Sequence, residues 1–191
     1  MTAPNTTDVH SFSGKGDNKR TGDNPWAIEP MPAGLIDSPL DFIFAEHHRQ
    51  REAASILTLL ADGEFDLKGV KSLLAFLETD FALHIGDEEL ALFPMLREHC
   101  LPEDNVERIL ARLVDEHRED EASLETATAI LVKGVSDKQL GVNDKRRLRM
   151  FAEHIRQHLA LENGVLLPIA RVRLRENELG ILADLLKARR L

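Results

Sequence analysis

"HIGDEELALFP" (residues 84–94) and "HLALENGVLLP" (residues 158–168) follow the same order: a histidine, a glutamate four positions later, and a proline six positions after the glutamate. On an α-helix, residues four positions apart project from the same face, one turn apart. Each stretch therefore places an imidazole beside a carboxylate on a helix that the proline should bend or restart.

The repeat extends beyond these two stretches. A Glu-His pair occurs at residues 46–47 and again at residues 116–117. His84 follows His47 by 37 positions, and His158 follows His117 by 41 positions. The chain therefore contains two copies of one helical hairpin, and each copy carries Glu-His on its first helix and H-x-x-x-E on its second.

Apolar residues at spacings of three and four predict four long helices. These helices are expected from residue 38 to about 60, from 67 to 98, from about 102 to 132 and from about 144 to 170, with a short fifth helix within residues 175–191. Short links between long amphipathic helices favour an antiparallel arrangement. The expected fold class is all-α, an up-down four-helix bundle with a short extra C-terminal helix.

Residues 1–36 have a different composition from the rest. The segment "SFSGKGDNKRTGDNP" (residues 11–25) is rich in Gly, Ser, Asp, Asn and Lys and nearly free of apolar side chains. Such a segment buries too little surface to order itself. We expect residues 1–36 to form a disordered tail and residues 37–191 to form one domain. The alternative is that Trp26 and Ile28 dock on that domain.

The overall composition excludes several classes of protein. A formal net charge of −9 argues against a nucleic-acid partner. No run of 18 apolar residues predicts a membrane span, and the N-terminus has no apolar signal core. The single cysteine, Cys100, can form neither an internal disulfide nor a zinc-finger type of site. We therefore expect a cytoplasmic protein.

The histidines and glutamates of the repeat lie within apolar helical stripes, where a carboxylate is costly unless it is paired or bound to a metal. Four imidazoles and two carboxylates exceed the needs of one ion, so we expect two metal ions bridged by the glutamates. A His/Glu set without thiolate suits iron or manganese, and less exclusively zinc. The spacing also differs from the E-x-x-H pairs of ferritin-like sites. The candidate ligands are His47, His84, Glu88, His117, His158 and Glu162.

The segment from about residue 39 to residue 170 resembles the hemerythrin HHE cation-binding family. The resemblance rests on "EHHRQRE" (46–52), "HIGDEELALFP", "DEHREDE" (115–121) and "HIRQHLALENGVLLP" (154–168). It implies a four-helix bundle around a non-haem, oxo- or hydroxo-bridged di-iron centre held by the six candidate ligands. It also places iron ahead of manganese and zinc as the expected cofactor.

Two positions depart from the family pattern or add to it. Oxygen-carrying hemerythrins have a second histidine four residues after the ligand of the third helix, and this chain has Glu121 there. This difference disfavours reversible oxygen carriage, and Glu121 itself remains a candidate ligand. His154 lies one turn before His158 and is either a fifth histidine ligand or a residue that orients a ligand.

The sequence leaves three functions open. The first is a di-iron protein that binds, senses or responds to oxygen, nitric oxide or iron, acting through an unidentified protein partner. The second is a di-iron oxidase or peroxidase, or a binuclear hydrolase, on the same site. The third is a bundle that has lost its metal, which the complete ligand set disfavours. No dedicated general base or substrate pocket is recognisable, so binding is expected rather than catalysis, in a monomer or homodimer.

Overall fold

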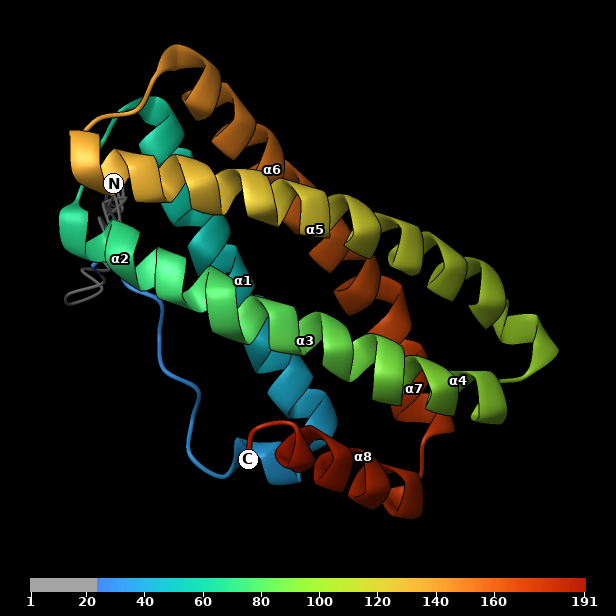
Figure 1. Ribbon diagram of the computed structural model, residues 1–191. Helices are drawn as coiled ribbons and strands as arrows, with labels where there is room; N and C mark the ends of the chain where they lie inside the picture. Colours follow the sequence, from blue (N-terminus) through green and yellow to red (C-terminus); the bar gives the residue numbers. More distant parts are fainter. Residues whose placement is uncertain (1–23) are drawn as a thin grey trace, which may run out of the picture.

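The computed structural model describes residues 24–191, and these residues form helices without any strand. Four long antiparallel segments make a bundle, and a short helix lies across one end of it (Figure 1). This arrangement confirms the expected fold class and the extra C-terminal helix. The elements are α1 (Pro39–Asp62), then α2 (Leu67–Phe76), α3 (Ala82–Asp87) and α4 (Phe93–His99) in near continuity, α5 (Val106–Asp137), α6 (Val142–Leu161) with α7 (Leu167–Arg173), and α8 (Glu176–Ala188).

Local sequence signals set the ends of the first two helices. Pro39 occupies the first position of α1, where its missing N–H is not needed. Gly63 ends α1 with a φ of 100°, a left-handed conformation that glycine adopts without strain. The Asp66 side chain accepts a hydrogen bond of 2.6 Å from the backbone N–H of Gly69 and so caps α2.

The second and fourth helical segments widen at equivalent places. A π-helical turn covers Glu88–Leu92 just before Pro94, and another covers Glu162–Leu166 just before Pro168. Proline lacks an N–H, and its ring clashes with the carbonyl four residues earlier, so the preceding turn opens. Each widened turn begins at a candidate ligand glutamate. A third such turn, Leu77–Phe81, has no proline after it, and nothing in its sequence explains it.

Two apolar clusters fill the bundle, one towards each end, and a polar layer separates them. One cluster includes Leu57, Leu73 and Phe151, and the other includes Phe93 and Leu110. Every buried polar or charged residue among residues 24–191 lies in the layer between them. These residues are Glu46, His47, Gln50, His84, Asp87, Glu88, His117, Asp120, His158 and Glu162.

Residues 24–36 differ from the expected disordered tail, whereas residues 1–23 lie outside the described part of the chain. Trp26 and Ile28 pack against one apolar cluster, and the Trp26 side chain lies directly over Gly69. The backbone N–H of Glu29 donates to Glu52 Oε2 at 2.8 Å. The two apolar side chains supply the contact surface that the preceding polar sequence lacks, so the segment docks.

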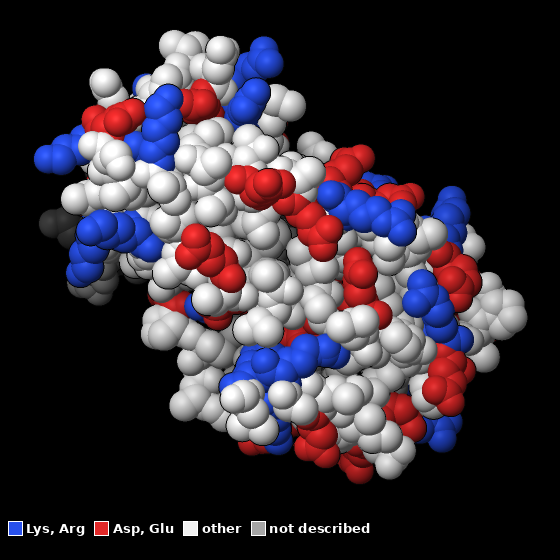
Figure 2. Space-filling view, in the orientation of Figure 1, with Lys and Arg blue, Asp and Glu red and all other residues white. Residues whose placement is uncertain are grey.

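The surface of the bundle carries both signs of charge. On the face shown in Figure 2, Lys and Arg side chains lie among Asp and Glu side chains rather than in one continuous patch. None of the helices within residues 24–191 combines the length and apolar character needed to cross a membrane.

Candidate metal centre

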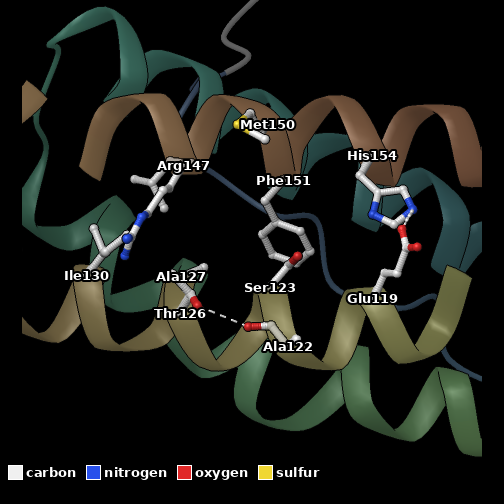
Figure 3. A pocket seen from close by; sticks show the side chains of 11 residues that line it. Glu119, Ala122, Ser123, Thr126, Ala127, Ile130, Arg147, Met150, Phe151 and His154 are labelled. Carbon is white, nitrogen blue, oxygen red and sulfur yellow. Dashed lines mark hydrogen bonds and ion pairs between the residues drawn. The ribbon is translucent and has the colours of Figure 1, made fainter. Parts of the chain in front are cut away.

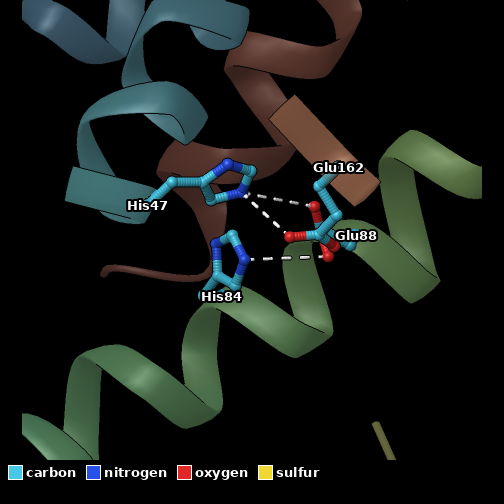
Figure 4. A group of neighbouring side chains, drawn as sticks. All are labelled: His47, His84, Glu88 and Glu162. Carbon is cyan, nitrogen blue, oxygen red and sulfur yellow. Dashed lines mark ion pairs between the residues drawn. The ribbon is translucent and has the colours of Figure 1, made fainter. Parts of the chain in front are cut away.

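The six candidate ligands of the repeat converge in the polar layer. They form two groups, and within each group the potential ligand atoms all lie within 4.8 Å of one another. Glu88 and Glu162 belong to both groups, so the two groups share their carboxylates. Figure 4 shows the first group, in which the two imidazoles face the two carboxylates. The groups are His47, His84, Glu88 and Glu162, and Glu88, His117, His158 and Glu162.

Each helical segment of the bundle contributes to this convergence. His47 projects from the middle of α1, and His117 projects from the middle of α5. His84 lies on α3, and Glu88 follows one turn later at the start of the widened turn. The fourth segment repeats this arrangement on α6, so the two H-x-x-x-E stretches occupy equivalent positions.

In the first group, the Nε2 atoms face carboxylate oxygens without forming hydrogen bonds to them. His47 Nε2 lies 3.4 Å from Glu162 Oε2 and 3.8 Å from Glu88 Oε1. His84 Nε2 lies 3.7 Å from Glu88 Oε2. The His47 and His84 rings meet edge to face, with 4.9 Å between their centroids.

The second group has the same design with one shorter contact. His117 Nε2 lies 3.4 Å from Glu88 Oε2, and His158 Nε2 lies 2.9 Å from Glu162 Oε1. The His117 and His158 centroids are also 4.9 Å apart. The Phe93 ring stacks on His117 and closes this group on the side of the second apolar cluster.

The donor atoms themselves show that the residues fit a bound metal. Within these two groups, the buried atoms without a hydrogen-bond partner are both oxygens of each glutamate and the Nε2 atoms of three histidines. Buried polar groups are normally satisfied, and leaving so many unpaired in one place would be costly. Imidazole nitrogen and carboxylate oxygen are ligands of iron, manganese and zinc, so bound cations would satisfy these atoms.

Carboxylates raise the pKa of two histidines in the centre. Burial alone would lower the pKa of His84, but the negative charges of Glu88 and Glu46 outweigh it and raise the pKa to about 9. Burial likewise opposes the effect of Glu162 on His158, whose pKa rises to about 10. Without a cation in the centre, protons on these imidazoles therefore balance the carboxylate charge.

Burial and nearby charge also have opposite effects on the pKa of Glu88, one of the two shared glutamates. Burial alone would raise the pKa of Glu88, but the imidazoles of His84, His117 and His47 hold it well below its ordinary value. Glu88 therefore remains an anion in the interior. An ionised buried carboxylate surrounded by imidazoles is suited to a dication, which binds the deprotonated forms of both residue types.

A second set of side chains holds the outer nitrogen of each imidazole. His84 Nδ1 lies 3.1 Å from Glu46 Oε2, and His158 Nδ1 lies 2.9 Å from Glu116 Oε2. In each hairpin, the glutamate of the Glu-His pair thus contacts the histidine of the following helix.

The remaining two contacts run between the hairpins. His117 Nδ1 lies 2.8 Å from Glu89 Oε1, and His47 Nδ1 lies 2.9 Å from Asn163 Oδ1. Glu89 and Asn163 each directly follow a shared glutamate in the sequence. The four contacts therefore repeat the two-fold pattern of the sequence, with a neutral acceptor only at Asn163.

These contacts fix how each histidine presents itself to the centre. A carboxylate oxygen accepts hydrogen bonds, so it selects the imidazole tautomer with the proton on Nδ1. In the neutral imidazole, the lone pair of Nε2 is then directed into the centre and is free to bind a metal ion. This is the protonation state that a metal ligand requires.

These partners were not predicted as functional residues, although the sequence contains a signal for two of them. Glu46 and Glu116 were recognised only as markers of the repeat. A residue adjacent to a ligand on a helix points about 100° away from it, towards a neighbouring helix. It can therefore reach the ligand of that neighbour, and the repeated Glu-His pairs carried this information.

The structure places the remaining two candidates outside both groups. Glu121 is exposed on α5. His154 is partly buried at one end of a groove between α5 and α6, with Nε2 4.0 Å from Glu119 Oε2 (Figure 3). Its Nδ1 lies 3.3 Å from Asp120 Oδ1. Asp120 occupies the inward position that the sequence pattern had given to Glu121, because the helical register turns residue 120 towards the polar layer. Burial raises the pKa of Asp120, although His154 and His158 counteract it.

His48 follows His47 directly but lies outside the centre. Its side chain is 57% exposed, and its Nε2 lies 3.4 Å from Glu52, whereas His47 is fully buried. The two adjacent histidines therefore face opposite environments.

Comparisons with known proteins agree with this geometry. The sequence model of the Hemerythrin HHE cation binding domain matches residues 38–170, which is more than two-thirds of the chain. The matched segment contains all six residues of the two groups and ends before α8. A search of curated proteins finds no match.

Proposed function

The chain belongs to the hemerythrin HHE cation-binding family, and from this premise we propose that it is a non-haem di-iron protein that binds, senses or responds to oxygen, nitric oxide or iron. The observation that carries the proposal is the pair of buried His/Glu groups that share Glu88 and Glu162. Their unpartnered donor atoms support a binuclear centre.

The division of the ligands supports two ions. His47 and His84 would hold one ion, and His117 and His158 would hold the other. Glu88 and Glu162 would bridge them, since each belongs to both groups. Iron is the proposed metal because the set contains imidazole and carboxylate but no thiolate, with manganese and zinc as alternatives.

Two iron ions in this centre would supply redox chemistry with a diatomic ligand. The surrounding residues would orient the ligands for these ions. Glu46, Glu116, Glu89 and Asn163 hold the Nδ1 protons, so the Nε2 atoms keep a fixed direction. The apolar clusters on either side of the polar layer restrict the entry of water.

The surroundings favour binding over turnover of a large substrate. The groove between α5 and α6 has a volume of about 560 Å³, and its lining includes His154, Phe151 and Arg147. None of the six proposed ligands lines it. We therefore propose a ligand-binding or sensing role ahead of the oxidoreductase and hydrolase alternatives.

Anaerobic titration with Fe²⁺ tests the proposal. We expect saturation at two ions per chain, followed by an absorption band near the ultraviolet edge when oxygen is added, and a distinct spectrum with nitric oxide. Saturation at one ion in a protein of native helicity would contradict the binuclear centre. Turnover of peroxide would favour the oxidoreductase alternative.

A further inference from the structure

The C-terminal helix α8 lies outside the matched family segment, yet the residues at its end reach the polar layer. Arg190 is the second residue after α8, and its Nη2 lies 2.8 Å from Glu46 Oε1 and 2.6 Å from Asp87 Oδ2. Both carboxylates are buried, at 4% and 0% exposure. One guanidinium nitrogen thus links α8 to α1 and α3.

Glu46 transmits this contact to the centre. Its second oxygen, Oε2, lies 3.1 Å from Nδ1 of His84. We propose that Arg190 is a positioning residue of the metal centre, which acts through Glu46 on His84 and so couples the docking of α8 to metal binding in the first group. This inference rests on the proposed function, because His84 must be a ligand for the coupling to exist.

The charges explain why Glu46 needs a cation. Glu46 and Asp87 share the cation Arg190 in the interior, and a buried carboxylate without a partner is strongly destabilising. Arg190 contacts both carboxylates and Arg189 contacts Asp87 as well, so Arg190 can hold one Glu46 oxygen while the other remains directed at His84. The Arg190 guanidinium also lies over the Phe42 ring, 4.6 Å from its centroid, which fixes it on the α1 side.

Within residues 24–191, the second hairpin has no such support from another segment. Glu116 holds His158 as Glu46 holds His84, but its cation is Arg112, one turn earlier on the same helix. The Arg112 side chain is 61% exposed, so water screens this pair. The two ligand groups are therefore equivalent in sequence but differ in their surroundings. The segment that carries α8 acts on the first group only.

A neighbouring arginine supplies a matched control. Arg189 contacts the same buried Asp87, with Nε 3.2 Å from Oδ1, and donates to the carbonyl of Gly86 at 3.2 Å. It does not contact Glu46. Arg189→Gln thus removes one arginine from Asp87 and leaves the contact of Arg190 with Glu46, and so the link to His84, in place.

The test compares Arg190→Gln, Arg189→Gln and wild type by anaerobic Fe²⁺ titration against a competing chelator. We expect Arg190→Gln to bind one of its two ions about ten- to a hundredfold more weakly, the usual effect of removing a partner that orients a ligand. Arg189→Gln should retain wild-type affinity for both ions, and Arg190→Lys should recover part of the loss because it keeps the charge.

A double mutant and a spectroscopic measurement separate positioning from general stability. With Glu46→Gln already present, Arg190→Gln should add little further loss, because the chain to His84 is already broken. In Zn²⁺-loaded protein, the imidazole nitrogen shifts of His84 should change in Arg190→Gln, whereas those of His158 should not. A purely structural role would not produce this selectivity.

Failure of the coupling and failure of the proposed function would give different results. Equal affinities in Arg190→Gln and wild type, or equal losses in Arg190→Gln and Arg189→Gln, would overturn the coupling and leave the binuclear centre intact. A wild-type protein that binds fewer than two ions would instead refute the proposed function. If Arg190→Gln does not fold without metal, the comparison of Arg190→Lys with Arg189→Gln decides, and no difference between those two would overturn the inference.

Discussion

At the scale of single residues, the histidines of the centre use both ring nitrogens. Nε2 faces the shared carboxylates, and Nδ1 faces an acceptor on a neighbouring helix, such as Glu46 for His84. A histidine held at Nδ1 by such an acceptor cannot rotate or change tautomer freely. The donor direction is therefore fixed before any ion binds, which reduces the ordering that metal binding requires.

Removal of one proposed ligand should be far more damaging than removal of an adjacent histidine. We expect His84→Ala and His158→Ala each to weaken metal binding by more than about a hundredfold, the upper end of the range for indirect partners. His48→Ala should bind two ions like wild type, because its side chain is exposed. Metal analysis after dialysis checks this, and loss of metal in His48→Ala would contradict the assignment.

Removing the negative charge beside His158 should weaken metal binding less than removing a ligand does. Glu116→Gln keeps an acceptor oxygen but removes the negative charge beside Nδ1, so His158 becomes a weaker base. We expect about tenfold weaker binding of one ion in chelator competition. Glu119→Gln, with a side chain 75% exposed on the same helix, is the control and should match wild type. Equal affinities in both variants would show that Glu116 does not act on the centre.

At the scale of helices, the two hairpins direct their shared glutamates into the polar layer in the same way. Each places a proline six residues after its glutamate, and the turn between them widens. The widening shifts the helical register by about one residue. Glu88 can therefore face the polar layer while Leu92, Phe93 and Leu96 all reach the apolar cluster beyond it.

The docking of the N-terminal segment depends on the absence of a side chain at Gly69. A Cβ at this position would lie 2.7 Å from Trp26 Cβ and 2.8 Å from its Cε3, so Gly69→Ala should displace the indole. Trp26 is the only tryptophan, and its fluorescence therefore reports the displacement directly. We expect a red-shifted emission maximum, whereas metal binding at the distant polar layer should be retained.

Gly180→Ala on α8 is the control for this substitution. A Cβ there meets no atom within 4 Å, so the emission should not change. Alanine should also stabilise this helix by about 0.5–1 kcal/mol. An unchanged emission in Gly69→Ala would mean that Trp26 does not dock on α2.

At the scale of the whole molecule, a charged layer divides the hydrophobic interior. Ten buried polar or charged residues lie between the two apolar clusters. Such a layer contributes little to stability unless its charges are balanced, either by protons on the imidazoles or by metal ions. The fold and the metal centre are therefore thermodynamically linked, and bound metal should raise the stability of the entire bundle.

This linkage should depend on pH in a defined direction. The pKa values of His84 and His158 are raised in the folded metal-free protein to about 9 and about 10, above the ordinary value of 6.5. Their stabilising effect is complete below pH 6.5 and is lost as the pH rises through 9 and 10. Between these limits, the free energy of unfolding of metal-free protein should fall by on the order of 1 kcal/mol per pH unit for each proton.

Metal-loaded protein should not show this decline, because its ligand imidazoles are already neutral. We therefore expect the difference in thermal midpoint between Zn²⁺-loaded and metal-free protein to increase from pH 6.5 to pH 8.5. Calorimetry in buffers of different ionisation enthalpy should also detect protons released on binding. A constant difference in midpoint, without proton release, would show that these histidines are not protonated in the metal-free centre.

The bundle and the six candidate ligands could be predicted from the sequence alone. Helical periodicity fixes which side chains share a face, so His84 with Glu88 and His158 with Glu162 could be paired without coordinates. The repeated hairpin then required the two pairs to meet. The family match agrees with the resemblance of these motifs.

That Glu89 and Arg190 support the ligands could not be predicted from the sequence, because it depends on how the helices pack. The contacts of Glu89 with His117 and of Arg190 with Glu46 join residues 28 and 144 positions apart. Helical periodicity describes one helix and carries no information about which neighbour its flank will meet. The choice between Asp120 and Glu121, and the docking of Trp26 on Gly69, depended in the same way on how the helices rotate and pack against one another.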